Sequence, residues 1–81
     1  MRIAEIIPQG GYTLKIISEE GQIGFFDVEP YLQAEAFIPL SNKNEFNKIH
    51  NGKFFIEWDC GADLSADTIE AKMERKSRVS D

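Results

Sequence analysis

The sequence predicts a single α+β domain, in which a four-stranded, mainly antiparallel sheet packs with two short helices. Three observations indicate this class. The chain has 81 residues, 42% of them hydrophobic and 11% aromatic, which is enough for one compact core and one domain. Apolar and polar residues alternate along residues 12–18 and 22–28, as they do in half-buried strands. Helix-capping residues precede two later apolar segments.

Three of the four expected strands lie in the N-terminal third of the chain. Residues 2–7 predict a strand that Pro8 ends. Residues 12–18 and 22–28 predict a hairpin around a three-residue loop, in which Gly21 adopts the left-handed conformation.

The middle of the chain predicts less regular structure. Residues 29–32 indicate a short helical turn, because Pro30 suits the first turn of a helix. Residues 37–40 indicate an irregular apolar segment. Asn42, with Glu45 three residues later, resembles a capping box and predicts the start of a helix. The apolar face and the end of this helix are expected at Phe46, Ile49 and Asn51-Gly52.

A strand and a helix are expected to close the domain. Residues 53–58 predict the last strand, with one buried face made of Phe54, Ile56 and Trp58. Ser65 or Asp67 can cap the final helix, and Glu70 would complete a capping box with Asp67. Ile69 and Met73 would share the apolar face of that helix.

Both faces of the expected sheet carry apolar residues. The residues opposite the main alternation are Ala4, Ile6, Ile17, Phe26, Val28 and Phe55. Either the helices and residues 37–40 cover both sides, which we favour, or a partner chain covers one side. A surface for such a partner would comprise Ile17, Phe26, Phe55, Trp58 and Asp63.

The net charge of −5 is unevenly distributed. Residues 1–71, the expected domain, hold five Lys or Arg against twelve Asp or Glu, a net −7. Residues 72–81, expected to be a charged and frayed tail, hold four against two, a net +2. The acidic body opposes nucleic-acid binding, because it repels phosphates. Weak nucleic-acid contact through the basic tail stays open as an alternative.

The sequence also predicts a cytoplasmic location. A single cysteine, Cys60, excludes an internal disulfide and fits a reducing compartment. The opening residues include Glu5 and lack the apolar core of a secretory leader. No apolar run approaches the roughly 18 residues of a membrane span.

One cluster of carboxylates could bind a hard cation or support acid/base chemistry. It consists of Asp59, Asp63, Asp67 and Glu70. Its spacing does not match a calcium-binding EF-hand loop, and local turn and helix-terminus roles account for each residue. We therefore expect no metal, no cofactor and no catalytic residue. A metal-assisted or acid/base enzyme built on Asp59, Asp63 and Asp67 remains the alternative.

Cys60 and His50 are the only candidate nucleophile and imidazole in the chain. A catalytic pair of this kind needs mutual hydrogen-bond reach and positive surroundings that stabilise the thiolate. Asp59 and Asp63 instead make the surroundings of the thiol acidic. The sequence therefore predicts that the protein is not an enzyme.

Five segments carry a resemblance to a known family. They are the hairpin at 12–26, the segments 26–32 and 37–40, the helix near Phe46, and residues 58–69. The most specific part is Gly61-Ala62-Asp63-Leu64 with Asp67-Thr68-Ile69. In this layout the chain resembles the bacterial and phage family called domain of unknown function 2442, over about residues 1–71. It departs from the family at Asp59-Cys60, where members commonly carry Pro-Asn.

The resemblance implies a small α+β domain that occurs alone or fused to a helix-turn-helix DNA-binding domain. It also implies an antitoxin-like role, since some members sit beside small toxin-like proteins, and it transfers no catalytic residue. The chain ends at Asp81, so we expect no helix-turn-helix and no DNA binding by that route. We therefore expect a non-enzymatic interaction module, antitoxin-like or regulatory. It would bind a partner protein, such as a basic toxin-like protein, or a second copy of itself.

Overall fold

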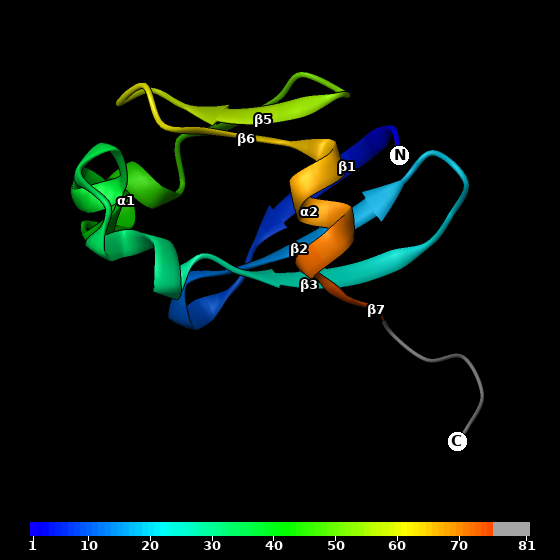
Figure 1. Cartoon of the computed structure of the whole chain (residues 1–81), viewed down its shortest axis with the longest axis horizontal. Coiled ribbons are helices and arrows are strands. Elements are labelled where there is room, and N and C mark those ends of the chain that lie inside the picture. Colours follow the sequence, from blue (N-terminus) through cyan, green and yellow to red (C-terminus); the bar gives the residue numbers. More distant parts are fainter. Residues whose placement is uncertain (76–81) are drawn as a thin grey trace.

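Two antiparallel sheets face each other across a shared core in the computed structural model, which describes residues 1–75 (Figure 1). The first sheet has the order β1-β2-β3-β7 and the second has the order β4-β5-β6. The strands of the first sheet are β1 (Ile3–Pro8), β2 (Thr13–Ser18), β3 (Ile23–Asp27) and the two-residue β7 (Glu74–Arg75). Those of the second are β4 (Ile49–Asn51), β5 (Phe55–Trp58) and β6 (Asp63–Ser65).

The α+β class is confirmed, but the prediction of one four-stranded sheet is wrong. The strand predicted at 53–58 does not join the N-terminal hairpin. It becomes β5, the centre of a separate sheet between β4 and β6. Strands β4 and β6 were not predicted, because each has three residues, which is too short for an alternating pattern to stand out.

The hairpin of β2 and β3 is confirmed. The Ser18 N–H donates to the Gln22 carbonyl at 2.9 Å and closes a three-residue loop, in which Gly21 has φ +89°. Leu14 lies opposite Phe26, so both point into the core.

The main buried face is therefore not the one expected for β3. Phe26 and Val28 are buried, whereas Ile23 and Phe25 lie on the other side of the sheet. Ile6 also points inward, opposite Ile16, after an irregularity in the pairing of β1 between Ile3 and Glu5.

One short 3-10 helix lies between β1 and β2, and two more lie between β3 and the second sheet. The first, η1 (Gly10–Tyr12), precedes β2. The predicted helical turn forms as η2 (Glu29–Gln33), with Pro30 in its first turn. The apolar segment expected at 37–40 lies in η3 (Glu35–Ser41), which buries Phe37 and Leu40.

The predicted N-cap Asn42 is correct, but the helix is shorter than expected. The Asn42 side chain accepts a hydrogen bond from the Asn44 N–H at 2.8 Å and starts α1 (Lys43–Phe46). The helix ends after one turn. Ile49 starts β4 and pairs with Trp58, so it does not extend the helix.

The C-terminal helix α2 (Ala66–Lys72) begins at Ser65, whose Oγ accepts from the Thr68 N–H at 3.1 Å. Met73 is 8% exposed and packs against Gly24, where an added Cβ would lie 2.6 Å from its sulfur. β7 then pairs with β3. Residues 73–75 therefore pack against the first sheet, and residues 76–81 of the expected tail lie outside the described residues. Among the described residues, no helix has the length and hydrophobicity that crossing a bilayer requires.

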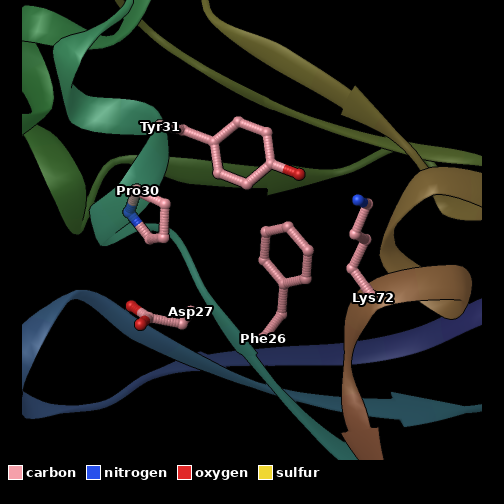
Figure 2. Close-up of a pocket in the computed structure, with 5 residues that line it drawn as sticks. All are labelled: Phe26, Asp27, Pro30, Tyr31 and Lys72. Carbon is pink, nitrogen blue, oxygen red and sulfur yellow. The ribbon is translucent and has the colours of Figure 1, made fainter.

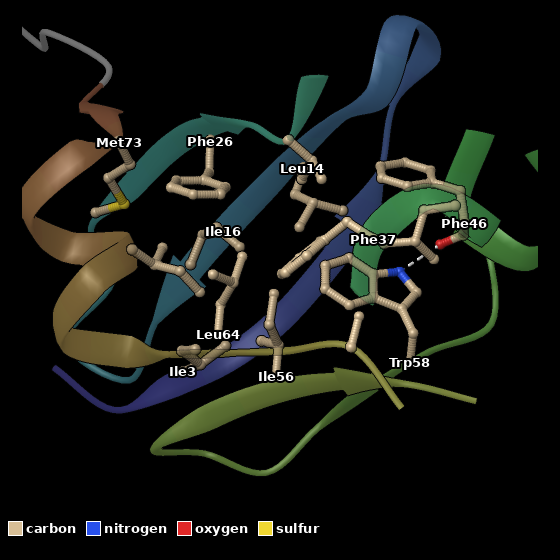
Figure 3. Packing of buried hydrophobic residues seen from close by; sticks show 14 of the residues in the cluster. Ile3, Leu14, Ile16, Phe26, Phe37, Phe46, Ile56, Trp58, Leu64 and Met73 are labelled. Carbon is tan, nitrogen blue, oxygen red and sulfur yellow. Dashed lines mark hydrogen bonds between the residues drawn. The ribbon is translucent and has the colours of Figure 1, made fainter. Parts of the chain in front are cut away.

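A continuous series of six aromatic rings runs through the core (Figure 3 shows its buried members). In order of contact the rings are Tyr12, Phe46, Trp58, Phe37, Tyr31 and Phe26. At its centre, the Trp58 Nε1–H donates to the Phe46 carbonyl at 2.9 Å, a buried hydrogen bond drawn in Figure 3. This series joins the first sheet, the connecting segments and the second sheet into one core.

Replacing Trp58 by Phe should lower the free energy of unfolding by about 1–3 kcal/mol, because it leaves the buried Phe46 carbonyl without its donor. Urea unfolding followed by circular dichroism measures the loss. Phe54→Leu is the control: Phe54 is 58% exposed, contrary to the predicted burial, so its replacement should change stability by no more than about 0.5 kcal/mol. Equal losses for the two variants would contradict the role given to Trp58.

Met73→Ala should cost about 2–3 kcal/mol, because it removes a buried side chain that fills the space over Gly24. The neighbouring exposed Glu74→Ala serves as the control and should be nearly neutral. If Met73→Ala were also neutral in chemical denaturation, the domain would end before residue 73.

Candidate functional site

The first sheet is covered on one side only. Figure 1 shows α2 and the second sheet on the same side of β1, β2 and β3. Four half-buried apolar side chains point to the opposite side and do not pack against the core cluster. We call the surface they form the outer face of the first sheet; its apolar members are Ile7, Ile17, Ile23 and Phe25. Within residues 1–75, the expectation that the chain covers both sides of its own sheet is therefore wrong.

Lys15 lies at the centre of this outer face. Its cross-strand neighbours are Ile7 on β1 and Phe25 on β3. Ile17, two residues along the same strand, lies on the same face. Within the described part of the chain, no ion pair involves Lys15. A macromolecule that covered this face would therefore bury a cation that has no ion-pair partner among residues 1–75, at a cost of several kcal/mol.

A shallow hollow borders the outer face at its β3 edge. Its volume is about 390 Å³, and it is lined by Thr13, Phe25, Asp27, Lys72 and Glu74. Glu74 is the β7 neighbour of Phe25, and Asp27 is the β3 neighbour of Thr13. The apolar centre of the face thus passes into a charged rim, an arrangement found in protein interfaces.

The outer face of the second sheet has a different chemistry. Its cross-strand row consists of His50, Glu57 and Asp63, all exposed. Phe55, on the same face, is 40% exposed, and its ring lies over Gly52, where an added Cβ would approach it to 2.4 Å. This second surface is acidic, with one exposed aromatic ring.

The residues predicted as one interaction surface are separated in the structure. Ile17 lies on the outer face of the first sheet, whereas Phe55 and Asp63 lie on that of the second. Phe26 and Trp58 are 1% and 2% exposed, so the prediction that they belong to a partner surface is wrong. The burial of Trp58 agrees with the buried face predicted for residues 53–58, whereas Phe26 was assigned to the wrong side of its strand.

Most residues of the outer face of the first sheet were not predicted from the sequence. Ile7, Lys15, Ile23 and Phe25 were not named as surface residues. The signal was present in the hairpin: with Gly21 fixing a three-residue loop, Ile17 and Ile23 must lie opposite each other.

The carboxylate cluster does not converge. Asp59 contacts the Nε2 of His50 at 2.5 Å, while Asp67 lies on α2. Glu70, also on α2, pairs with the amino terminus of Met1 at 3.2 Å. Within residues 1–75, no three His, Cys, Asp or Glu side chains are grouped so that they could hold a metal ion.

The two side chains considered as a catalytic pair, His50 and Cys60, have different surroundings. The His50 imidazole contacts Asp59, and among the described residues no hydrogen bond joins it to the exposed Cys60. Nucleophilic catalysis needs that contact.

Magnesium, calcium or manganese at micromolar concentration should produce no saturable shift in the backbone NMR signals of residues 59–70, because no three of the described acidic side chains are grouped to hold a metal ion. The N-terminal hairpin provides the internal reference. A saturable, localised shift would support the metal-assisted alternative.

Comparison with known proteins gives one result. A family model described as "Protein of unknown function (DUF2442)" matches residues 3–75. No curated protein and no solved structure matches the chain. Because the match covers nearly the whole chain, including both sheets and α2, the chain belongs to the DUF2442 family.

Proposed function

We propose that this domain is a non-enzymatic interaction module that binds a partner protein through the outer face of the first sheet. One observation carries the proposal: this face holds four half-buried apolar side chains around Lys15, with Glu5 opposite Ile17, and no described element covers them. Exposed apolar patches on small domains commonly mark interaction sites. The separation of Asp59, Asp63 and Asp67 favours binding over catalysis.

The energetics require more than apolar contact. Completing the burial of four half-buried side chains would contribute about 1 kcal/mol each. Association costs at least about 4 kcal/mol in lost translational and rotational freedom. Apolar burial alone would therefore give weak binding. Affinity and specificity must come from the polar groups, of which Lys15 is the central one.

Lys15 defines the chemistry of the partner. A surface that covers it without a counter-charge would leave a desolvated ammonium group, so the partner should present a carboxylate surrounded by apolar groups. A second copy centred on the same face would bring two Lys15 side chains together. A different protein therefore suits this face better than self-association.

The acidic outer face of the second sheet supports a second candidate function, antitoxin-like binding of a basic toxin-like protein. Glu57 and Asp63 lie side by side there, with Phe55 on the same face. Carboxylates beside an exposed ring suit Lys and Arg side chains. Nucleic-acid contact through the basic tail stays a weaker alternative, because the acidic body repels phosphates.

Ile17→Lys should abolish partner binding if the outer face of the first sheet is the site, because it places a second cation beside Lys15. Phe55→Lys is the matched control on the other sheet. A protein retained from native lysate by the wild type is purified, and its affinity for each variant is measured by calorimetry. We expect a loss of at least about tenfold for Ile17→Lys and little change for Phe55→Lys.

Substitutions of Lys15 test how much the charge of this residue contributes to partner binding. Lys15→Glu should abolish binding, and Lys15→Met should also weaken it strongly, because removing one member of a buried ion pair leaves the partner's carboxylate without a counter-charge. The reverse pattern, with Phe55→Lys disruptive and Ile17→Lys neutral, would move the site to the second sheet. Sedimentation tests self-association: a dimer that Ile17→Lys dissociates would identify a second copy as the partner.

A further inference from the structure

A separate pocket opens between β3, η2 and the C-terminal end of α2 (Figure 2). Its volume is about 440 Å³, and its lining is mainly apolar. The lining residues are Phe26, Asp27, Pro30, Tyr31 and Lys72. A volume of this size lies within the range of about 300–1,000 Å³ that is typical of small-ligand sites.

The walls of the pocket are held by the core. Phe26 is 1% exposed, and its ring contacts that of Tyr31 at 5.6 Å between centroids. Tyr31 in turn contacts Phe37 at 5.7 Å. Pro30, with its restricted φ angle, fixes the first turn of η2. A ligand would therefore meet a preformed apolar wall, which lowers the entropic cost of binding.

Two polar groups lie together at one end of the pocket. Figure 2 shows the Tyr31 hydroxyl and the Lys72 ammonium at the same end, beyond the edge of the Phe26 ring. In the described part of the chain, neither group takes part in a hydrogen bond or ion pair. A cation and a hydroxyl donor beside an apolar wall are suited to a carboxylate.

The other charged groups limit how much negative charge the ligand can carry. Asp27 lies at the opposite end, where its Oδ1 accepts the Glu29 N–H at 3.0 Å. Glu74 shares the neighbouring hollow with Lys72. No ion pair joins Lys72 to either acid within the described residues, so its charge remains available. With two carboxylates near one ammonium, a single negative charge fits better than a phosphate dianion.

We propose that this pocket binds a carboxylate carried on an apolar body. Lys72 and Tyr31 would hold the carboxylate, and Phe26, Tyr31 and Pro30 would contact the apolar part. The same chemistry has two sources, a small free acid with an aryl or alkyl group and the C-terminal residue of a peptide. This site is distinct from the outer face of the first sheet, because Phe26 and Tyr31 pack on the inner side of that sheet.

The test uses four probes: 3-phenylpropanoate, its amide, a pentapeptide ending in Phe, and the same peptide with an amidated C-terminus. Binding is followed by NMR shifts of residues 26–31 and 72 in the whole chain. Both acids should give saturable shifts at millimolar concentration or below, and both amides should bind at least about tenfold more weakly, because they lack the charge. A peptide that binds much more tightly than the free acid identifies a C-terminus as the ligand, and the reverse identifies a small acid.

Variants then test the assigned residues. Lys72→Ala should weaken acid binding about tenfold and Tyr31→Phe about threefold, because they remove a charged and a neutral donor, respectively. Lys48→Ala removes an exposed lysine outside the pocket and should change nothing. Ile17→Lys should also leave acid binding intact, which separates this site from the proposed partner surface. Equal binding of acid and amide, no saturable shift, or an unchanged affinity in Lys72→Ala would overturn the proposal.

Discussion

The contact between Trp58 and Phe46 is the constraint on which the rest of the architecture depends. It combines ring packing, at 6.2 Å between centroids, with a buried hydrogen bond from the indole to a backbone carbonyl. The carbonyl belongs to the end of α1, so the second sheet fixes where the connecting segments stop. Tyr12 continues the series to the start of β2, where it holds a φ of +65° and its hydroxyl donates to the Ser41 carbonyl. Such a backbone angle is unfavourable for a bulky residue and persists because several contacts fix it.

The second sheet and α2 lie on the same side of the first sheet, which explains why the other side is uncovered by the described residues. Six of the nine aromatic residues form the continuous series, and the other three are Phe25, Phe54 and Phe55. All three point away from the core, and Phe25 lies on the outer face of the first sheet. In this chain of 81 residues, most of the large side chains lie in the core between the first sheet and the elements that cover it, the second sheet and α2. The outer apolar surface is thus a consequence of where the core forms.

The parts of the fold that the sequence predicted are those set by local rules. Alternation and Gly21 were sufficient for the hairpin, and Asn42 and Ser65 marked the helix starts. The second sheet was not predictable in this way, because β4 and β6 depend on pairing with β5 and carry little pattern of their own. Phe54 was misplaced because it follows Lys53, whose φ of +72° puts both residues in a turn before β5 starts. Of the candidate surface, Ile17 was predicted, and the three-residue loop also determines that Ile23 and Phe25 lie beside it; only the position of Ile7 next to Lys15 depends on the pairing of β1 with β2.

The two proposed sites share one electrostatic feature. Among the described lysines, Lys43 contacts the Tyr12 ring and Lys48 and Lys53 pair with glutamates. Lys15 and Lys72 have no such partner within residues 1–75, although the chain holds fourteen acidic residues against nine basic ones. Long-range repulsion from the acidic body opposes any anionic ligand, while contact at either lysine favours it. Only a ligand that reaches the lysine itself, within a few ångströms, gains more than it loses. The net negative charge thus opposes polyanions, and at the two proposed sites it favours ligands that carry a single carboxylate.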